Sequence, residues 1–206
     1  MLTLYYSPGA CSMAPHIVLE EGGEKYELKR VDFSKAEQRS EAYIKAVHHL
    51  GRVPALGGID AGPPLTENTA ILPYLGKRYK LWPTDPVVEA RANSTIGFFA
   101  ATVHPAHAHI SRPERYATDK EHFPDIQAQG RKLFFDYLTM VDGMLAGRQW
   151  LLDGYSVLDP YAFTFYVWGV RRELPMAELK NYGAHKDRML ARSAVQRVVE
   201  DEKLKV

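Results

Sequence analysis

The chain has 206 residues, a formal net charge of +1 and a single cysteine. This length allows one or two domains with a sizeable core, and the balanced charge argues against a nucleic-acid-binding protein. One cysteine excludes an internal disulfide and a dithiol redox motif, which favours a reducing cytoplasm. No apolar run has the length of a membrane span, and the N-terminal residues do not resemble a secretory signal.

The first eighty residues alternate between strand and helix patterns. Leu2–Tyr6 and Tyr26–Val31 are predicted strands, separated by a helix over about 13–21 that Gly22-Gly23 ends. A strand, helix and strand in this order predict a right-handed crossover and parallel pairing. The following segments are a short helix over 40–47, a strand over 53–56, a hairpin loop over 57–64 and a helix over 67–75 that contains Pro73.

Two prolines in the segment 81–87 predict a linker, because neither a helix nor a strand crosses such a segment easily. Everything beyond it is helix-like, with helices expected over about 88–102, 125–145 and 185–202. Ser156 and Asp159 have the spacing of a capping box, and the apolar run from Tyr161 to Trp168 predicts a buried helix. The expected organisation is an α/β domain over 1–80 and an all-α domain over 88–206.

The single cysteine, Cys11, lies where the first strand gives way to the first helix. Ser12 is the predicted N-cap, so the thiol would adjoin free backbone N–H groups and the positive end of the helix dipole. Such a position can lower a thiol pKa and make the sulfur a better nucleophile. The alternative is a buried and inert cysteine, since free cysteine is among the most frequently buried residues.

Four motifs in order resemble the glutathione S-transferase family, and its cysteine-containing bacterial beta-class branch in particular. They are Ser-Pro-Gly-Ala-Cys-Ser at 7–12, Arg-Val-Pro at 52–54, Glu-Asn-Thr-Ala-Ile-Leu at 67–72, and Ser156 with Asp159. The resemblance covers nearly the whole chain. It implies a thioredoxin-like N-terminal domain, an all-α C-terminal helical domain, a cis peptide before Pro54 and glutathione bound in the cleft between the domains.

The resemblance also implies which residues act on glutathione. Cys11, Ser12 and His104 would be the catalytic residues near the sulfur. Glutathione would contact Tyr6, Cys11, Lys35, Val53, Pro54, Glu67, Asn68 and His104. Glutathione serves as a co-substrate, no other cofactor is expected, and the implied partners are a small hydrophobic electrophile and a second copy of the chain in a homodimer.

Several residues depart from the pattern of the branch, and more of its ligand contacts are kept in the first domain than in the second. Arg52 stands where a glutamine is common, Pro105 where a lysine often follows the histidine, and Gly97 where an asparagine is frequent. The leading function is transfer of glutathione to an electrophile in detoxification. The first alternative is thiol–disulfide exchange through a mixed disulfide on Cys11, and the second is a non-catalytic ligand-binding protein of the same fold.

The histidines at 104, 107 and 109 also suggest a metal site. His104 and His107 could share a helical face, but His109 would be turned away by about 140°, and no acidic residue or cysteine lies in the cluster. No metal is therefore expected. His107 and His109 are expected to be solvated or capping residues.

Overall fold

The protein, described by a computed structural model over all residues from Met1 to Val206, contains one mixed sheet with strand order β2-β1-β3-β4. The elements of this part are β1 (Leu2–Tyr6), α1 (Met13–Gly22), β2 (Tyr26–Arg30), η1 (Phe33–Lys35), η2 (Glu37–Arg39), α2 (Glu41–Ala46), β3 (Ala55–Gly57), β4 (Leu65–Thr66) and α3 (Asn68–Arg78). β1 pairs parallel with β2 and antiparallel with β3, which pairs antiparallel with β4. The expected crossover and hairpin are confirmed, and the domain is thioredoxin-like.

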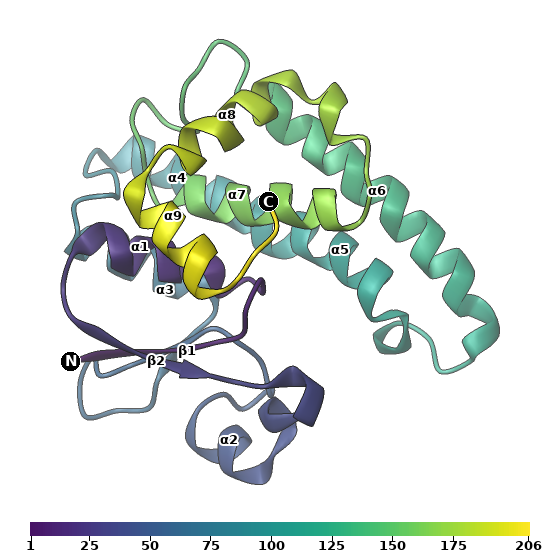
Figure 1. The fold of residues 1–206 in the computed structure, drawn as a ribbon, viewed down its shortest axis with the longest axis horizontal. Helices are drawn as coiled ribbons and strands as arrows, with labels where there is room; N and C mark the ends of the chain where they lie inside the picture. The colour runs from purple at the N-terminus through teal and green to yellow at the C-terminus, as the bar shows by residue number, and fades with distance from the viewer.

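The sheet lies between helices on its two faces. α1 and α3 cover one face and α2 covers the other (Figure 1). On the central strand, Leu4 pairs with Leu28 of β2 and Leu56 of β3, and both Leu4 and Leu56 are fully buried. Apolar residues at alternate positions of β1 therefore fix its register against the helical layer.

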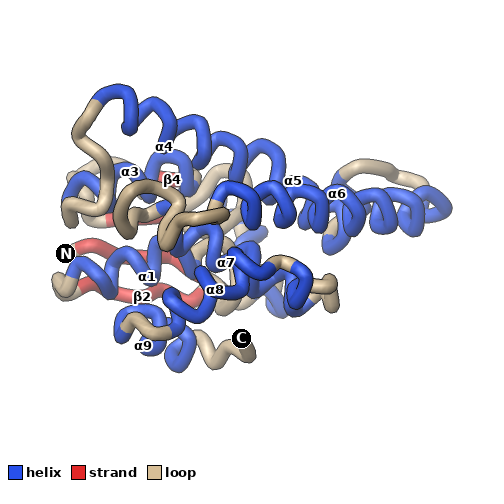
Figure 2. The backbone as a smooth tube through the Cα atoms, turned by 90° about the horizontal axis from the view of Figure 1, so that it is seen from above, coloured by secondary structure: helices blue, strands red, loops and turns tan.

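The second part of the chain is entirely helical, as expected. Its elements are α4 (Pro86–Phe98), η3 (Phe99–Val103), α5 (His104–Ser111), η4 (Pro113–Arg115), η5 (Lys120–His122), α6 (Phe123–Met144), α7 (Leu158–Arg171), η6 (Met176–Glu178), α8 (Lys180–Leu190) and α9 (Ser193–Asp201). α5 and the long α6 pack together and extend beyond the sheet (Figure 2). No helix combines the length and hydropathy that a bilayer span requires.

The predicted buried helix is confirmed as α7, whose residues from Leu158 to Gly169 are all buried. α1 packs against both α7 and α9, so the core continues from one domain into the other. At the start of α7, Asp159 accepts a hydrogen bond from the Ser156 N–H at 2.8 Å, as a capping box requires. Asp159 also accepts from the Leu151 N–H at 3.0 Å, which ties the preceding loop to this helix.

The helix expected to end near residue 102 instead continues to Ser111. Between α4 and α5 the backbone widens into the π-helical segment η3, in which the His104 N–H bonds to the carbonyl of Phe99, five residues earlier. Pro105 follows directly and has no N–H to donate. A local change of helical period accommodates this missing donor without ending the helix. His104 therefore lies in the middle of a long helical segment.

The single last helix expected over 185–202 is wrong, because the chain breaks between α8 and α9. Arg192 has an extended backbone at this break (φ −83°, ψ 129°). Its guanidinium binds both carboxylate oxygens of Glu21 on α1, at 2.6 and 3.0 Å, and lies 3.6 Å from the centre of the Tyr155 ring. A contact with a residue distant in the sequence therefore determines where this helix is interrupted.

Candidate functional site

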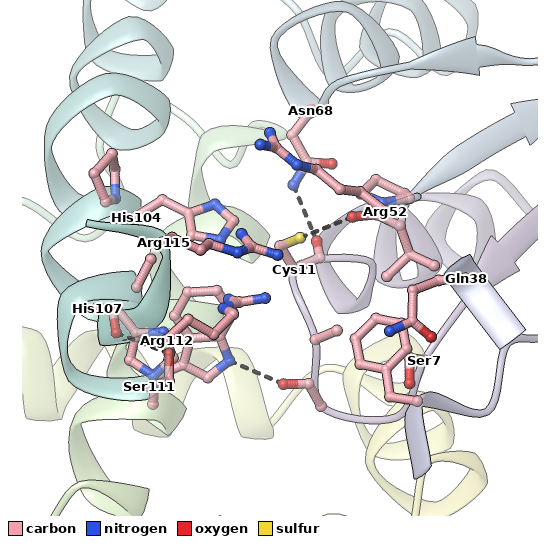
Figure 3. Close-up of a pocket in the computed structure, with 18 of the residues that line it drawn as sticks. Ser7, Cys11, Gln38, Arg52, Asn68, His104, His107, Ser111, Arg112 and Arg115 are labelled. Atoms are coloured by element: carbon pink, nitrogen blue, oxygen red, sulfur yellow. Dashed lines mark hydrogen bonds between the residues drawn. The ribbon is translucent and has the colours of Figure 1, made fainter. Parts of the chain in front are cut away.

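A cavity of about 700 Å³ lies between the sheet domain and the helical domain. Its walls come from the loop between β1 and α1, the turn before β3, the start of α3, the α5–η4 region and the end of α7. Figure 3 shows the two walls facing each other across Cys11. This volume is in the range of small-molecule binding sites.

Cys11 is connected to both neighbouring segments of the first domain. Its thiol donates a hydrogen bond to the carbonyl of Val53 at 3.2 Å, and Val53 is joined to Pro54 by a cis peptide bond. The carbonyl of Cys11 accepts a hydrogen bond from the Asn68 side-chain amide at 3.0 Å. Three segments that are distant in the sequence thus meet at one residue.

The loop before Cys11 is fixed by the second domain. The Gly9 N–H donates to the carboxylate of Glu202 at 2.6 Å, and the Gly9 carbonyl accepts from the indole N–H of Trp168 at 2.9 Å. Gly9 has φ 67°, and a Cβ there would lie 2.1 Å from Nη1 of Arg171. Only glycine suits this position, both for its backbone and for the available space.

The expected lowering of the Cys11 pKa is wrong. Burial raises the pKa of the Cys11 thiol to about 12, and this effect outweighs the opposing influence of the Arg112 guanidinium. The side chain is 9% exposed and precedes the first helical residue, Met13, by two positions. The thiol is therefore protonated at neutral pH and acts as a hydrogen-bond donor.

Ser12 lies at the N-cap position, but its side chain makes no capping hydrogen bond. Its hydroxyl instead donates to the Ser7 carbonyl at 3.2 Å and accepts from the Ser7 N–H at 3.1 Å. The side chain is fully buried and does not line the cavity. Ser12 thus closes the loop that carries Cys11, and it does not face the pocket.

The structure brings six of the residues that the resemblance implies to one cavity and leaves three outside it. Those that line the cavity are Cys11, Val53, Pro54, Glu67, Asn68 and His104. Tyr6 is 9% exposed and packs on the ring of His16, with ring centres 5.6 Å apart. Lys35 is exposed, and its amine lies 4.0 Å from the carboxylate of Asp32. Ser12 is the third residue outside the cavity.

Two features of the α3 N-terminus are suited to a polar ligand. Glu67 has φ 69° and ψ 129°, an unfavourable conformation for a residue with a side chain, and its carboxylate is exposed at the cavity. Asn68 is 5% exposed, and its Oδ1 is buried without a hydrogen-bond partner. This buried oxygen can therefore accept a hydrogen bond from a donor on a bound ligand.

The histidines on α5 have different environments. His104 points into the pocket (Figure 3), and burial, reinforced by Arg112, lowers its pKa to about 4. His107 is buried and stacks on Trp168 with ring centres 4.2 Å apart, so the expectation of a solvated residue is wrong. Burial, reinforced by Arg172, lowers the pKa of His107 to about 2. Both imidazoles are neutral at neutral pH.

His109 stacks on Tyr116 at 3.8 Å and donates through Nδ1 to the Pro105 carbonyl at 2.8 Å. Its ring is thus engaged on a different side of α5 from His107. His109 does not line the cavity, whereas His104 and His107 do.

Sequence reasoning missed the arginines of the cavity. Only Arg52 stands out in the sequence, as a departure from the branch. The cavity is lined by Arg39, Arg52, Arg112, Arg115, Arg171 and Arg172. The sequence signal is the run Arg112-Pro113-Glu114-Arg115 directly after the histidine-rich helix. A proline there favours the end of the helix, so the two arginines are expected at the helix end that follows His104.

Comparisons with known proteins show the family to which the chain is similar. The sequence model of the glutathione S-transferase N-terminal domain matches residues 1–77. Glutathione S-transferase GstA of Escherichia coli O157:H7 is 32% identical over 209 residues, covering 99% of this chain and 100% of that protein. A glutathione transferase homologue from Sulfitobacter, solved with bound glutathione, is 34% identical with a TM-score of 0.92, covering 99% of each chain.

A bacterial beta-class glutathione S-transferase, from Sphingomonas chungbukensis, is 28% identical with a TM-score of 0.85, covering 98% of this chain and 100% of that chain. Full-length similarity at this level, the matching N-terminal domain and the agreement of both domains in space lead to one conclusion. The chain belongs to the glutathione S-transferase family.

Proposed function

We propose that the protein is an enzyme that transfers glutathione to small electrophiles with an apolar body, with glutathione as its co-substrate. The observation that carries this proposal is the meeting of Cys11, Val53 and Asn68 at one wall of the interdomain cavity. A peptide lying along this wall would pair with the Val53 backbone as an added strand does. Its γ-glutamyl end would reach the start of α3.

At the start of α3 the two side chains have different tasks. The Glu67 carboxylate would accept from the α-ammonium of glutathione, and the buried Asn68 Oδ1 would take a further donor. The backbone N–H groups at this helix start would bind the α-carboxylate. Lys35 and Tyr6 lie outside the cavity, so we assign them no direct contact.

In the transfer step, the glutathione thiol loses its proton to water and its thiolate attacks the electrophilic carbon. The new S–C bond forms as the leaving group departs with its bonding electrons. The neutral His104 imidazole is one donor that we place beside the attacking sulfur. The protonated Cys11 thiol is the other, and its S–H would turn from the Val53 carbonyl to the sulfur when the glutathione backbone pairs with Val53. Ser12 is a positioning residue, since its hydroxyl holds the loop that carries Cys11.

The raised pKa of Cys11 favours conjugation over thiol–disulfide exchange. A thiol whose pKa is raised in this way is almost entirely protonated at pH 7. Exchange through Cys11 requires its thiolate as the nucleophile, whereas conjugation requires only that it donate a hydrogen bond. Conjugation is therefore the function that this geometry supports best.

The test is conjugation of glutathione to 1-chloro-2,4-dinitrobenzene, with reduction of a glutathione mixed disulfide as the competing assay. We expect Asn68→Ala to weaken glutathione binding by about 1–3 kcal/mol through lost hydrogen bonds. Gln149→Ala is the matched control, because Gln149 is exposed and does not line the cavity. Cys11→Ala should retain part of the conjugation. Absence of conjugation in the wild type, with efficient disulfide reduction, would instead identify the protein as an oxidoreductase.

We further infer membership of the beta-class branch, supported by the Ser-Pro-Gly-Ala-Cys-Ser motif and by the likeness to the Sphingomonas structure. We place the enzyme in the cytoplasm, since its only cysteine is free, as is usual in a reducing compartment. A role in detoxification follows from the proposed transfer of glutathione to electrophiles. Residues 81–87 are the proposed linker between domains over 1–80 and 88–206. Limited proteolysis should map this boundary.

We also propose a homodimer. Val87 on α4 and Met140 and Met144 on α6 are apolar side chains with 62%, 52% and 38% of their surface exposed. Burial of such side chains between two copies would stabilise the pair. Sedimentation equilibrium at micromolar concentration tests this, and a monomer there would contradict it. No contact with nucleic acid or membrane is part of the proposal.

A further inference from the structure

The cavity has a strong excess of positive charge. Six arginines line it, and only two carboxylates, those of Glu67 and Glu114, lie among them. None of the six arginines has a carboxylate oxygen within 4.0 Å, although arginines elsewhere in the chain, such as Arg78 and Arg192, bind glutamates directly. Unpaired like charges around one cavity destabilise the ligand-free protein.

Arg112 shows the clearest sign of a missing partner. Its Nε is buried and has no hydrogen-bond acceptor. A guanidinium N–H enclosed in this way is unfavourable unless an acceptor reaches it. Figure 3 shows Arg112 and Arg115 extending toward Cys11 from the side of His104. Because Arg112 lines the cavity, an acceptor for its Nε can reach it from the cavity.

The arginines also repel one another. Arg115 is exposed at its surface, but partial desolvation beside the cavity lowers its pKa. The charges of Arg112 and Arg52 lower it further, while Glu114 opposes them with a smaller effect. Burial also lowers the pKa of Arg172, and the charge of Arg112 lowers it further. These shifts mean that an anion placed among the guanidinium groups would relieve repulsion as well as form new hydrogen bonds.

Binding of glutathione alone does not account for all six arginines that line the cavity. Its γ-glutamyl end belongs at Glu67 and Asn68, and its glycyl carboxylate has Arg39 and Arg52 available on the same wall. Arg112 and Arg115 come from η4 and its flank on the opposite wall, next to Pro105, Tyr116 and Trp168. Tyr116 is 45% exposed, whereas Trp168 is buried and stacked on His107. An exposed aromatic ring beside unpaired cations suits an aromatic acid.

Resting on the proposed transferase function, we infer that the second substrate carries a negative charge: an electrophile with an apolar, aromatic body and a carboxylate that Arg112 and Arg115 bind. The planar guanidinium groups can bind a carboxylate through paired hydrogen bonds. The carboxylate takes no part in the reaction and orients the electrophilic carbon toward the sulfur of glutathione.

A matched pair of electrophiles tests the charge. In 4-chloro-3,5-dinitrobenzoate and its uncharged carboxamide, the glutathione thiolate attacks the carbon bearing chlorine, the S–C bond forms, chloride leaves with the bonding pair, and the thiol proton goes to water. Each kcat/KM is divided by the rate constant of the same reaction without enzyme, which removes the difference in intrinsic reactivity. We expect the wild type to favour the carboxylate at least tenfold, and added salt to reduce this preference.

Substitutions at Arg112 and Arg115 test whether these two residues cause the preference for the carboxylate. Arg112→Gln and Arg115→Gln should each reduce the carboxylate-to-carboxamide ratio by about tenfold, chiefly through KM, and Arg115→Lys should retain part of it. Arg148→Gln is the control, because Arg148 is exposed, outside the cavity and free of ion pairs, and it should leave the ratio unchanged. Arg115 is exposed, so its substitution does not depend on the tolerance of the core.

Binding of the two glutathione conjugates, measured by calorimetry, separates this inference from the proposed function. Tighter binding of the carboxylate conjugate, lost in Arg115→Gln, supports the anion site even if no electrophile is turned over, an outcome that would reject the transferase function alone. Equal affinities for the two conjugates, or a wild-type ratio near one with both electrophiles turned over, would overturn the inference and leave the transferase function standing.

Discussion

The carboxylate of Glu202, just beyond α9, accepts a hydrogen bond of 2.6 Å from the backbone N–H of Gly9, two residues before Cys11. Its other oxygen lies 2.9 Å from Nδ1 of His16 on α1. Glu202 is 3% exposed, so a buried carboxylate from the C-terminal segment holds the loop of the first domain. The position of the cysteine therefore depends on a residue nearly two hundred positions later in the chain.

Replacing Glu202 by alanine should leave both Gly9 and His16 without their acceptor. We expect Glu202→Ala to lower the free energy of unfolding by about 2–4 kcal/mol, because two buried hydrogen bonds to a charged group are lost. The KM for glutathione should rise as the loop before Cys11 loosens. Chemical denaturation and steady-state kinetics measure the two effects.

The control for this substitution is Glu200→Ala, since Glu200 is exposed and its side chain has no ion pair. It should change neither quantity appreciably. Equal stability of the Glu202 and Glu200 variants would show that the interdomain hydrogen bonds contribute little.

The raised pKa of Cys11 predicts a slow thiol. At pH 7, alkylation of the native protein by iodoacetamide should be at least about 30-fold slower than that of a free cysteine, because the lower thiolate fraction outweighs the higher nucleophilicity of a more basic sulfur. Mass spectrometry follows the reaction at this single cysteine. The same chain in denaturant is the internal control and should react at the free rate.

The thiol also links stability to alkaline pH. The unfolded chain loses its thiol proton near pH 9, whereas the folded chain holds it to about pH 12. The contribution of this group to stability is thus fully present below pH 9 and is lost as the pH rises from 9 toward 12. Cys11→Ala should remove this part of the alkaline destabilisation. Rapid alkylation of the native thiol would contradict both expectations and return the mixed-disulfide mechanism to consideration.

The sequence predicted those parts of the fold that local patterns determine. A short apolar run and a glycine stop located β1 and α1, and the continuous apolar run at Tyr161–Trp168 located the buried α7. The break at Arg192 was missed, because it depends on an ion pair with Glu21 on another element. Local sequence carries no record of such a partner.

The candidate site divides in the same way. Motifs indicated residues such as Cys11, Val53 and Asn68, which the structure places around one cavity. The sign of the Cys11 pKa shift could not be predicted, because proximity to a helix start was visible in the sequence but burial by the second domain was not. Nor could the sequence show that Nε of Arg112 is buried without an acceptor, because this depends on which groups surround it in the folded chain.

At Glu67 the backbone conformation should lower the stability of the fold, while the side chain should strengthen glutathione binding. Its φ of 69° is unfavourable by about 1 kcal/mol or more for any residue with a Cβ, and glycine is free of this penalty. Glu67→Gly should therefore be about 1 kcal/mol more stable than Glu67→Ala by chemical denaturation. Both variants should bind glutathione about tenfold more weakly, because both lack the carboxylate.

The comparison of these two variants separates backbone from side chain. A glycine variant no more stable than the alanine variant would mean that the positive φ is not maintained in solution. Unchanged glutathione affinity in both would remove Glu67 from the binding site.

The buried imidazole of His107 should make the protein sensitive to mild acid. Burial, reinforced by Arg172, lowers its pKa to about 2, whereas the unfolded chain protonates this group near pH 6.5. A lowered folded pKa contributes stability that is fully present above pH 6.5 and is lost as the pH falls toward 2. Between pH 7 and pH 5 this one group should account for a loss of about 2 kcal/mol in the free energy of unfolding.

Substitution by a non-titrating ring isolates this effect. His107→Phe should keep the stacking on Trp168, whose ring centre lies 4.2 Å away, and it removes a buried Nδ1 that has no partner. It also removes Nε2, which accepts a hydrogen bond from Nε of Arg172 at 3.3 Å, so we expect a loss of about 1 kcal/mol in stability at pH 7. The variant should nevertheless lose less stability than the wild type between pH 7 and pH 5. Urea denaturation at both pH values measures the difference, with His122→Gln as a control at an exposed histidine. If the wild type and His107→Phe lose equal stability on acidification, His107 accepts a proton in the folded protein, and another buried group, of which His104 is the first to examine, causes the acid sensitivity.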